Sequence, residues 1–227
     1  MNNGGVPTMS ARHCFFANGL FAVILLGFAW AGPAWAADVN ITEELPYVDI
    51  TYDGRVVRIE RIQDTKHRLT NSFTKTSRKC PPFCVHPIKA APGVTTVGEL
   101  ELLDFMMTNV RQGMGLLVDA RTPAWHRKGT IPGAVNIPFT VCTAPPGDAN
   151  QTTVLKALGA TPIAGGNWDF RDAKQLLLFC NGPWCDQSPR AIKGLMRLGY
   201  PPEKLYYYRG GMQNWQMLGL TTVVPGS

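Results

Sequence analysis

Charged residues are nearly absent from the start of this sequence, where Arg12 is the only one among the first 36 residues. The other lysines and arginines form no run, although the formal net charge of the chain is +6. Nucleic-acid-binding segments usually contain such runs, so we expect no nucleic-acid partner. The sequence also has no internal repeat and no low-complexity tract, which excludes a repeat architecture.

Histidine is scarce as well, with four residues in the chain. His67, His86 and His126 show no spacing that is typical of a general base or of a metal-ligand set. A zinc site at Cys80 and Cys84 would need a second cysteine or histidine pair at ligand spacing, and only His86 lies nearby. We therefore predict no metal site, and no other cofactor is expected.

The one long apolar stretch, FFANGLFAVILLGFAW, follows Arg12 and precedes AGPAWA, which places Ala34 and Ala36 in a small-x-small pattern. This arrangement is typical of a signal peptide over residues 1–36 that is cleaved before Ala37. The alternative is an uncleaved membrane anchor, but the stretch is shorter than the about 20 residues that a spanning helix needs. We predict export to the periplasm without stable membrane insertion after cleavage.

Residues 37–92 differ in composition from the rest of the chain. Asp53-Gly54 lies between segments rich in β-branched residues, which predicts a β-hairpin. The stretch CPPFCVHPIKAAPG near the end of this region favours extended chain, because proline resists helix formation. We predict an N-terminal extension with a small β element. For its two cysteines, Cys80 and Cys84, we expect a local disulfide or a rigid extension. The alternative is that this segment folds over the loop after the central strand and presents its thiols to Cys180.

From residue 93 the sequence alternates between helical and strand patterns. The apolar runs GLLVDA and QLLLFC are typical of buried strands in a parallel sheet, and KLYYYRG is a third strand candidate. NQTTVLKALG predicts a short helix, and SPRAIKGLMRLG predicts another with Ser188 as its N-cap. The order predicts an α/β fold, a central parallel sheet flanked by helices on both faces.

A further helix is predicted by TTVGELELLDFMMTNV. Thr96 is the expected N-cap, and Glu99 three residues later completes a capping-box pattern. Val97, Leu100, Leu103 and Met107 recur at helical spacing, which predicts that they form the buried face of the helix.

Three motifs resemble rhodanese-like domains in the order in which they occur. LLVDARTPAWHRKGTIPGAVNIPF is similar to the opening signature of that family and contains Asp119, Arg121 and Gly133 as structural motif residues. YYYRGGMQNWQMLGLTTV is similar to the closing signature. Between them, the strand ending in LLLFC falls where the family keeps its catalytic cysteine, here Cys180. The resemblance covers residues 93–224 and implies a rhodanese-like fold.

The resemblance implies a sulfurtransferase. Cys180 would take sulfane sulfur from a small sulfur-containing anion such as thiosulfate, or from a persulfide donor, and hold it as a persulfide. A thiol acceptor, for example a periplasmic redox protein, would then remove it. A cysteine at the end of a central strand, facing a helix N-terminus, also suits a stabilised thiolate. We expect the substrate-binding residues to be Asn181, Gly182, Trp184, Asp186, Gln187, Ser188 and Arg190.

The loop departs from the family pattern, because Ser188 lies eight residues after Cys180 and Gln187 replaces the usual arginine. Counting forward from Cys185 gives Cys-x4-Arg, ending at Arg190, which makes Cys185 a rival nucleophile. The two cysteines could also act as a unit, in which one carries the persulfide and the other resolves it to a disulfide. A purely structural disulfide between them is a further alternative.

Three other functions remain open at this level. The altered loop is compatible with a non-catalytic binding module, since this fold can be kept while activity is lost. Thiol–disulfide chemistry could use Cys180 and Cys185, although dedicated oxidoreductases use a tighter Cys-x-x-Cys spacing. Phosphate or arsenate ester chemistry is the third, because longer loops of this fold resemble the loop of a phosphatase relative. That relative needs an arginine at the end of the loop, and the position counted from Cys180 does not hold one.

Overall fold

The computed structural model describes residues 39–226, so the predicted signal peptide lies outside the described residues. The strands are β1 (Tyr47–Tyr52), β2 (Arg55–Glu60), β3 (Thr95–Val97), β4 (Gly115–Asp119), β5 (Val135–Asn136), β6 (Thr161–Pro162), β7 (Trp168–Asp169), β8 (Gln175–Phe179) and β9 (Leu205–Tyr208). The helices are α1 (Glu99–Phe105), α2 (Pro123–His126), α3 (Phe139–Cys142), α4 (Ala149–Ala157), α5 (Gln187–Arg197) and α6 (Gly211–Met217). A π-helix (Met106–Val110) continues α1, and single 3-10 turns lie at Ser72–Thr74, Ala164–Gly166 and Pro202–Lys204. Between residues 39 and 226, no helix is long and apolar enough to cross a membrane.

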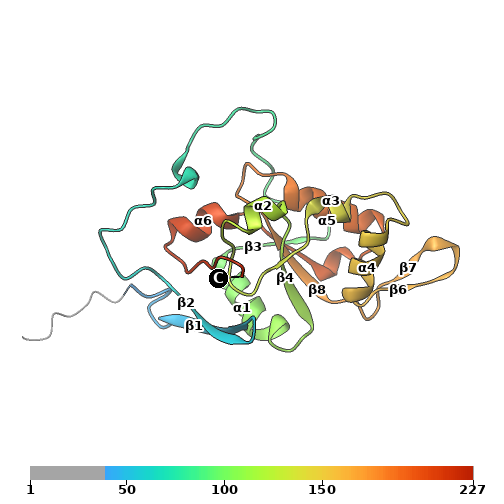
Figure 1. The fold of residues 1–227 in the computed structure, drawn as a ribbon, viewed down its shortest axis with the longest axis horizontal. Coiled ribbons are helices and arrows are strands. Elements are labelled where there is room, and N and C mark those ends of the chain that lie inside the picture. Colours follow the sequence, from blue (N-terminus) through green and yellow to red (C-terminus); the bar gives the residue numbers. More distant parts are fainter. Residues whose placement is uncertain (1–38, 227) are drawn as a thin grey trace, which may run out of the picture. The chain divides into compact units, whose positions relative to one another are not determined.

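The central sheet has five strands in the order β3-β9-β8-β4-β5, and every neighbouring pair is parallel (Figure 1). The predicted parallel sheet is confirmed, and the QLLLFC segment forms its middle strand, β8. Four consecutive residues of β8, Leu176 to Phe179, are at most 1% exposed. Such a continuous apolar run is required where helices cover both faces of a sheet.

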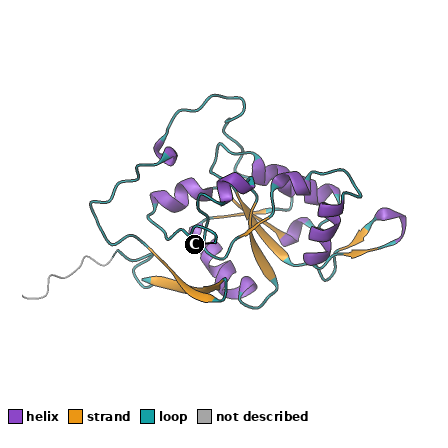
Figure 2. Cartoon of the chain, in the orientation of Figure 1, coloured by secondary structure: helices purple, strands orange, loops and turns teal. Residues whose placement is uncertain are grey.

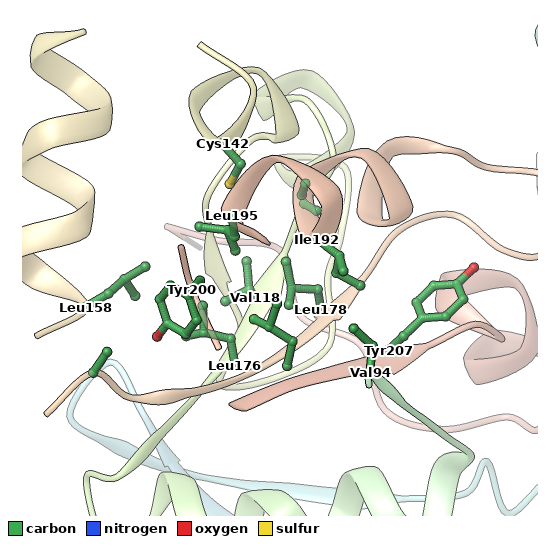
Figure 3. Close-up of a cluster of buried hydrophobic side chains, with 14 of the residues drawn as sticks. Val94, Val118, Cys142, Leu158, Leu176, Leu178, Ile192, Leu195, Tyr200 and Tyr207 are labelled. Atoms are coloured by element: carbon green, nitrogen blue, oxygen red, sulfur yellow. The ribbon is translucent and has the colours of Figure 1, made fainter. Parts of the chain in front are cut away.

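Both faces of the sheet are covered by helices, as the cartoon in Figure 2 shows. Alternate residues of β8 point to opposite faces. Leu176 and Leu178 join an apolar cluster with residues of α4 and α5 (Figure 3). Leu177 and Phe179 join a second cluster with residues of α1 and α6. The two clusters hold β8 in place, and they therefore fix the position of the residue that follows it.

The N-terminal extension contains the predicted hairpin. Strands β1 and β2 pair in antiparallel register. The turn between them uses positive φ angles at Asp53 (49°) and Gly54 (72°), which suits a tight hairpin turn. Val48 and Ile59 are buried in the cluster that contains α1 and α6. The hairpin is thus packed on the α/β domain and not merely tethered to it.

The first helix begins later than we predicted. Thr95–Val97 pair with β9 as strand β3, so Thr96 lies in the sheet and is not an N-cap. Helix α1 starts at Glu99, after Gly98. Glu101 rather than Glu99 completes the first turn, because its carboxylate accepts a hydrogen bond from the Gly98 N–H at 3.0 Å.

The predicted buried face of this helix is only partly correct. Leu103 is buried and Met107 is partly buried, but Leu100 is 49% exposed while Leu102 is fully buried. The error has a simple cause: Val97 was counted as the first apolar position of the helix, whereas it belongs to the strand. The real face begins with Leu102 and Leu103.

A candidate active site at the end of the central strand

Cys180 is the first residue after β8, at the carboxyl edge of the sheet, where parallel α/β folds bind ligands. Its carbonyl accepts a hydrogen bond from the Met212 N–H at 3.0 Å, which fixes it to the start of α6. Gly211 has a φ of +56°, and a Cβ there would overlap the Cys180 carbonyl. Glycine is therefore required for the close approach of α6 to this edge. We call residues 180–186, between β8 and α5, the cysteine loop.

The Cys180 sulfur is surrounded by hydrogen-bond donors. The Ser188 hydroxyl donates to it at 3.1 Å. Burial alone raises the pKa of Cys180, but hydrogen bonds from the Cys185 thiol and from the Ser188 hydroxyl and backbone outweigh it and lower the pKa below its ordinary value. The Gly182 N–H acts in the same direction. The Cys180 sulfur lies 3.2 Å from the Cys185 carbonyl oxygen, and the protonated thiol donates a hydrogen bond to it.

Ser188 has a different local role from the one we predicted. Helix α5 begins at Gln187, after Asp186, so Ser188 lies inside the first turn and is not the N-cap. Its side chain is fully buried and points to Cys180. From the first turn of α5 the Ser188 hydroxyl thus reaches the sulfur directly.

Cys142 and Cys185 are the other two free thiols of the described residues, and their surroundings favour the protonated form. Burial raises the pKa of Cys185 well above its ordinary value, and the hydrogen bond that it donates to Cys180 raises it further. Burial likewise raises the pKa of Cys142 to about 12. Cys180 and Cys185 are both free, and no disulfide joins them in this structure. Of the two rival nucleophiles, Cys180 has the environment of a thiolate.

This difference predicts that Cys180 ionises before the other two free thiols of the described residues. In a titration followed by the ultraviolet absorbance of thiolate, we expect one ionisation at a lower pH than that of an unperturbed thiol. It should disappear in the Cys180→Ser variant and persist in a Cys142→Ala control. If the low step remained in Cys180→Ser, the assignment of the thiolate to Cys180 would be wrong.

Behind the cysteine loop, Asp119 and Arg121 form a fully buried ion pair. The Arg121 guanidinium donates to both Asp119 oxygens, at 2.8 and 2.6 Å, and also to Asn181 Oδ1 at 3.3 Å. Asp119 accepts further hydrogen bonds from Thr130 Oγ1 and His126 Nδ1, both at 2.9 Å. Burial raises the pKa of Asp119, but the bonds from Arg121 and His126 lower it overall. The network supports the cysteine loop through the hydrogen bond from Arg121 to Asn181.

His126 and Thr130 were not identified from the sequence. Neither is at a spacing that indicates catalysis, and both reach Asp119 only because the chain turns back after α2. Gly133, the third structural motif residue, has a φ of +81° and packs against Ile50 of the hairpin. It shapes a turn away from the cysteine loop.

Trp184 connects the cysteine loop to residues outside it. Its indole N–H donates to Gln213 Oε1 at 2.7 Å, and a Cβ at Gly182 would lie in tight contact with both side chains, at 3.0 Å from Gln213 Oε1 and 3.3 Å from Trp184 Nε1. Phe83 meets the Trp184 ring edge to face at 5.7 Å, and the Arg78 guanidinium stacks on it at 3.8 Å. Trp184 is therefore held on two sides and is not free in the loop.

Arg78 and Phe83, which contact the Trp184 ring, belong to a segment that covers the cysteine loop. We call residues 78–86 the covering segment. His86 N–H donates to the Pro183 carbonyl at 2.9 Å, and Arg209 donates to the His86 carbonyl at 2.7 Å. Cys80 and Cys84 form the local disulfide that we predicted. The segment does fold over the loop, but its cysteines are bonded to each other and present no free thiol to Cys180.

The remaining predicted residues lie at the edge of the site. Asp186 and Arg190 are about half exposed and face each other at 3.8 Å. Arg190 also lies over the Phe139 ring at 4.4 Å. Arg190 occupies the fourth position of α5. Gln187 Oε1 is buried and has no hydrogen-bond partner. Within residues 39–226, no group of three or more His, Cys, Asp and Glu side chains is arranged to hold a metal ion.

Comparison with known proteins identifies the family of the chain. A family model described as a rhodanese-like domain matches residues 101–218. Solved structures similar to the chain include a thiosulfate sulfurtransferase from Pseudomonas aeruginosa, with 16% identity over 60% of this chain and 21% of that chain and a TM-score of 0.39. A rhodanese-related protein from Thermoplasma volcanium shares 18% identity over 57% and 98% of the two chains, with a TM-score of 0.38. A rhodanese with anions from E. coli shares 20% identity over 44% and 89%, with a TM-score of 0.29. No curated protein sequence matches the chain.

Proposed function

Because the chain belongs to the rhodanese-like domain family, we propose that it is a sulfurtransferase in which Cys180 carries sulfane sulfur as a persulfide. One observation carries the proposal. The Cys180 sulfur is buried at the carboxyl edge of the sheet and receives hydrogen bonds that favour its anionic form. The same donors would stabilise a persulfide anion, which carries its charge on the next sulfur.

The transfer has two displacement steps. The Cys180 thiolate attacks the outer sulfur of a thiosulfate-like donor, the S–S bond breaks, and its electron pair leaves with sulfite. The thiolate of an acceptor then attacks the outer sulfur of the Cys180 persulfide, and the Cys180 thiolate is released. A persulfide donor would follow the same first step and leave as a thiolate. No net oxidation is required.

A second candidate function uses both loop cysteines. Cys185 donates a hydrogen bond to the Cys180 sulfur, so the two sulfur atoms lie close enough for Cys185 to attack a persulfide on Cys180. That attack would form a Cys180–Cys185 disulfide and release hydrosulfide. The high pKa of Cys185 opposes this step at neutral pH, which is why we place sulfur transfer first.

We also propose that the protein acts in the periplasm, with a thiol acceptor such as a redox protein. The predicted signal peptide supports export, and the Cys80–Cys84 disulfide suits an oxidising compartment.

Rapid mixing with thiosulfate in the absence of acceptor tests the proposed function. We expect one equivalent of sulfite per protein in a single burst, because the persulfide cannot discharge. Addition of a thiol acceptor should then give continuous sulfite release. Absence of a sulfite burst with thiosulfate, together with absence of a thiol burst with a persulfide donor, would contradict sulfur transfer and favour a binding role.

A further inference from the structure

An open groove lies between helix α5 and the stretch of chain that follows the covering segment. One wall is formed by Lys89, Ala90, Ala91 and Pro92, and the other by Lys193, Met196 and Arg197 of α5. The volume of the groove is about 790 Å³. No residue of the cysteine loop lines it, so the groove is a surface separate from the candidate active site.

The apolar part of the lining is continuous with the core of the domain. Ala90 is buried, and Ala91 and Met196 are partly buried against the apolar cluster that contains Ile192 and Leu195 (Figure 3). These residues hold the two walls of the groove together. A concave apolar surface of this kind is typical of a place where another molecule binds.

The charged part of the lining is entirely positive. Lys89, Lys193 and Arg197 are exposed, and none of them forms an ion pair within residues 39–226. Arg197 lies in the last turn of α5, where the helix dipole favours a cation. The dipole does not account for Lys193, which precedes that turn, or for Lys89, which is outside the helix. The groove therefore complements a surface in which acidic side chains surround an apolar one.

Helix α5 connects the groove to the cysteine loop. It begins at Gln187, directly after the loop, and Arg190, Lys193 and Arg197 recur along it at intervals of three and four residues. Residues at these intervals lie on one face of a helix. With a rise of 1.5 Å per residue, Lys193 lies about 9 Å along the helix axis from its first residue. A row of positive charge thus leads from the loop to the groove.

The other wall of the groove is also joined to the cysteine loop. Lys89 follows His86 by three residues, and the His86 N–H donates to the Pro183 carbonyl of the loop at 2.9 Å. Both walls are therefore held in fixed positions relative to the loop. A molecule bound in the groove is placed beside the loop and does not need to enter it.

We propose that this groove docks the protein that accepts sulfur from the chain, through a surface where aspartate and glutamate side chains surround an apolar side chain. An apolar centre with a charged rim is the usual arrangement of a protein–protein interface. The role of the docked protein as the acceptor rests on the proposed function, whereas the chemistry of the contact rests on the groove alone. Lys89 to Pro92 lie outside the matched range 101–218, so this wall is an addition to the family domain.

Three fluorescent peptides of one length test the docking surface. The first has leucine and phenylalanine between aspartates and glutamates, the second has asparagine and glutamine in place of the acidic residues, and the third has serine in place of the apolar residues. Binding to the intact protein is followed by fluorescence anisotropy. We expect saturable binding of the first peptide alone, weakened by added salt, because salt screens exposed charges. No binding of the first peptide, or binding of the neutral peptide with the same Kd, would overturn the docking surface.

Lys193→Glu and the control Lys156→Glu make the same change of charge on two helices. Lys156 is exposed on α4 and does not line the groove. We expect Lys193→Glu to raise the Kd of the acidic peptide about tenfold, since an attraction becomes a repulsion of similar size. Lys89→Glu, on the opposite wall, should act in the same way, and Lys156→Glu should leave the Kd unchanged. An equal rise in all three variants, or no rise in the two groove variants, would refute the assignment.

A transfer measurement separates failure of the docking surface from failure of the proposed function. Thiosulfate is the donor, and the acceptors are the acidic peptide with one added cysteine and the small uncharged thiol β-mercaptoethanol. We expect Lys193→Glu to lower kcat/KM for the peptide by the same factor as it weakens binding, and to leave kcat/KM for the small thiol unchanged. Binding of the peptide without any sulfur transfer would refute the proposed function and keep the groove as a docking surface. Transfer to the peptide with no effect of Lys193→Glu would refute the docking surface and keep the proposed function.

Discussion

Replacement of Cys180 by serine is expected to abolish sulfite release from thiosulfate, whereas replacement of Cys185 by alanine should slow it only about tenfold. Cys180 supplies the thiolate, and a serine hydroxyl does not ionise at neutral pH. Cys185 contributes one hydrogen bond to that thiolate. A hydrogen bond to a charged group contributes about 1.5 kcal/mol or more, which is about a factor of ten in the thiolate fraction or the rate. Initial rates at neutral pH measure both effects.

The Cys185→Ser variant is the matched control for this prediction. Its hydroxyl can donate in place of the thiol, so it should recover most of the rate that Cys185→Ala loses. Raising the pH should also restore Cys185→Ala, because Cys180 then ionises without help. The rival assignment predicts the opposite pattern, in which both Cys185 variants lose all activity and Cys180→Ser retains some.

Replacement of Asp119 by alanine is expected to lower the free energy of unfolding by about 3–5 kcal/mol, since it leaves the Arg121 charge buried and unpaired. Both side chains are at most 1% exposed. For a domain of this size the loss corresponds to a fall in Tm of roughly 10 °C. Thermal unfolding followed by circular dichroism measures it.

The chain contains its own control for this pair. Asp169 and Arg171 repeat the Asp-x-Arg spacing, and the Arg171 N–H donates to Asp169 as the Arg121 N–H does to Asp119. The Arg171 side chain, however, is 87% exposed. Exposed ion pairs contribute little, so Asp169→Ala should change Tm far less than Asp119→Ala. Equal changes in Tm in the two variants would show that burial of the Asp119–Arg121 pair is not the cause of the destabilisation.

The effect of Asp119 should also depend on pH. Its pKa is lowered in the folded protein, so its contribution to stability is present above the carboxyl pKa of the unfolded chain, about 3.9. The contribution is lost as the pH falls through the lower folded value. The difference in stability between wild type and Asp119→Ala should therefore shrink at acidic pH, and a constant difference would argue against the ion pair as its cause.

Strands β4, β8 and β9 could be predicted from the sequence because they are short apolar runs with no competing pattern. QLLLFC is too short and too uniformly apolar for a surface helix, and it forms the central strand. The Thr95–Val97 strand was missed because its β-branched residues directly precede a helix and extend the helical spacing by one position. Only pairing with β9, more than 100 residues away, identifies it as a strand.

The parts of the candidate site that depend on neighbouring residues in the sequence could be predicted. The parts that depend on contacts between distant segments could not. A cysteine that ends a buried strand and faces a helix start already indicates Cys180. The contacts of Arg78 with Trp184 and of His86 with Pro183 join segments about 100 residues apart. No periodicity or spacing links these segments in the sequence. The contacts of the covering segment could be found only from the folded chain.

Mass spectrometry of the protein after reaction with thiosulfate shows whether Cys180 carries the transferred sulfur. The reduced protein is treated with thiosulfate, excess donor is removed, and intact mass and peptide masses are recorded without reductant. We predict a gain of one sulfur atom that fragmentation of the peptide locates on Cys180 and that is absent in Cys180→Ser. A sulfur adduct located on Cys185, or a loss of two hydrogens with no gain of sulfur, would contradict it.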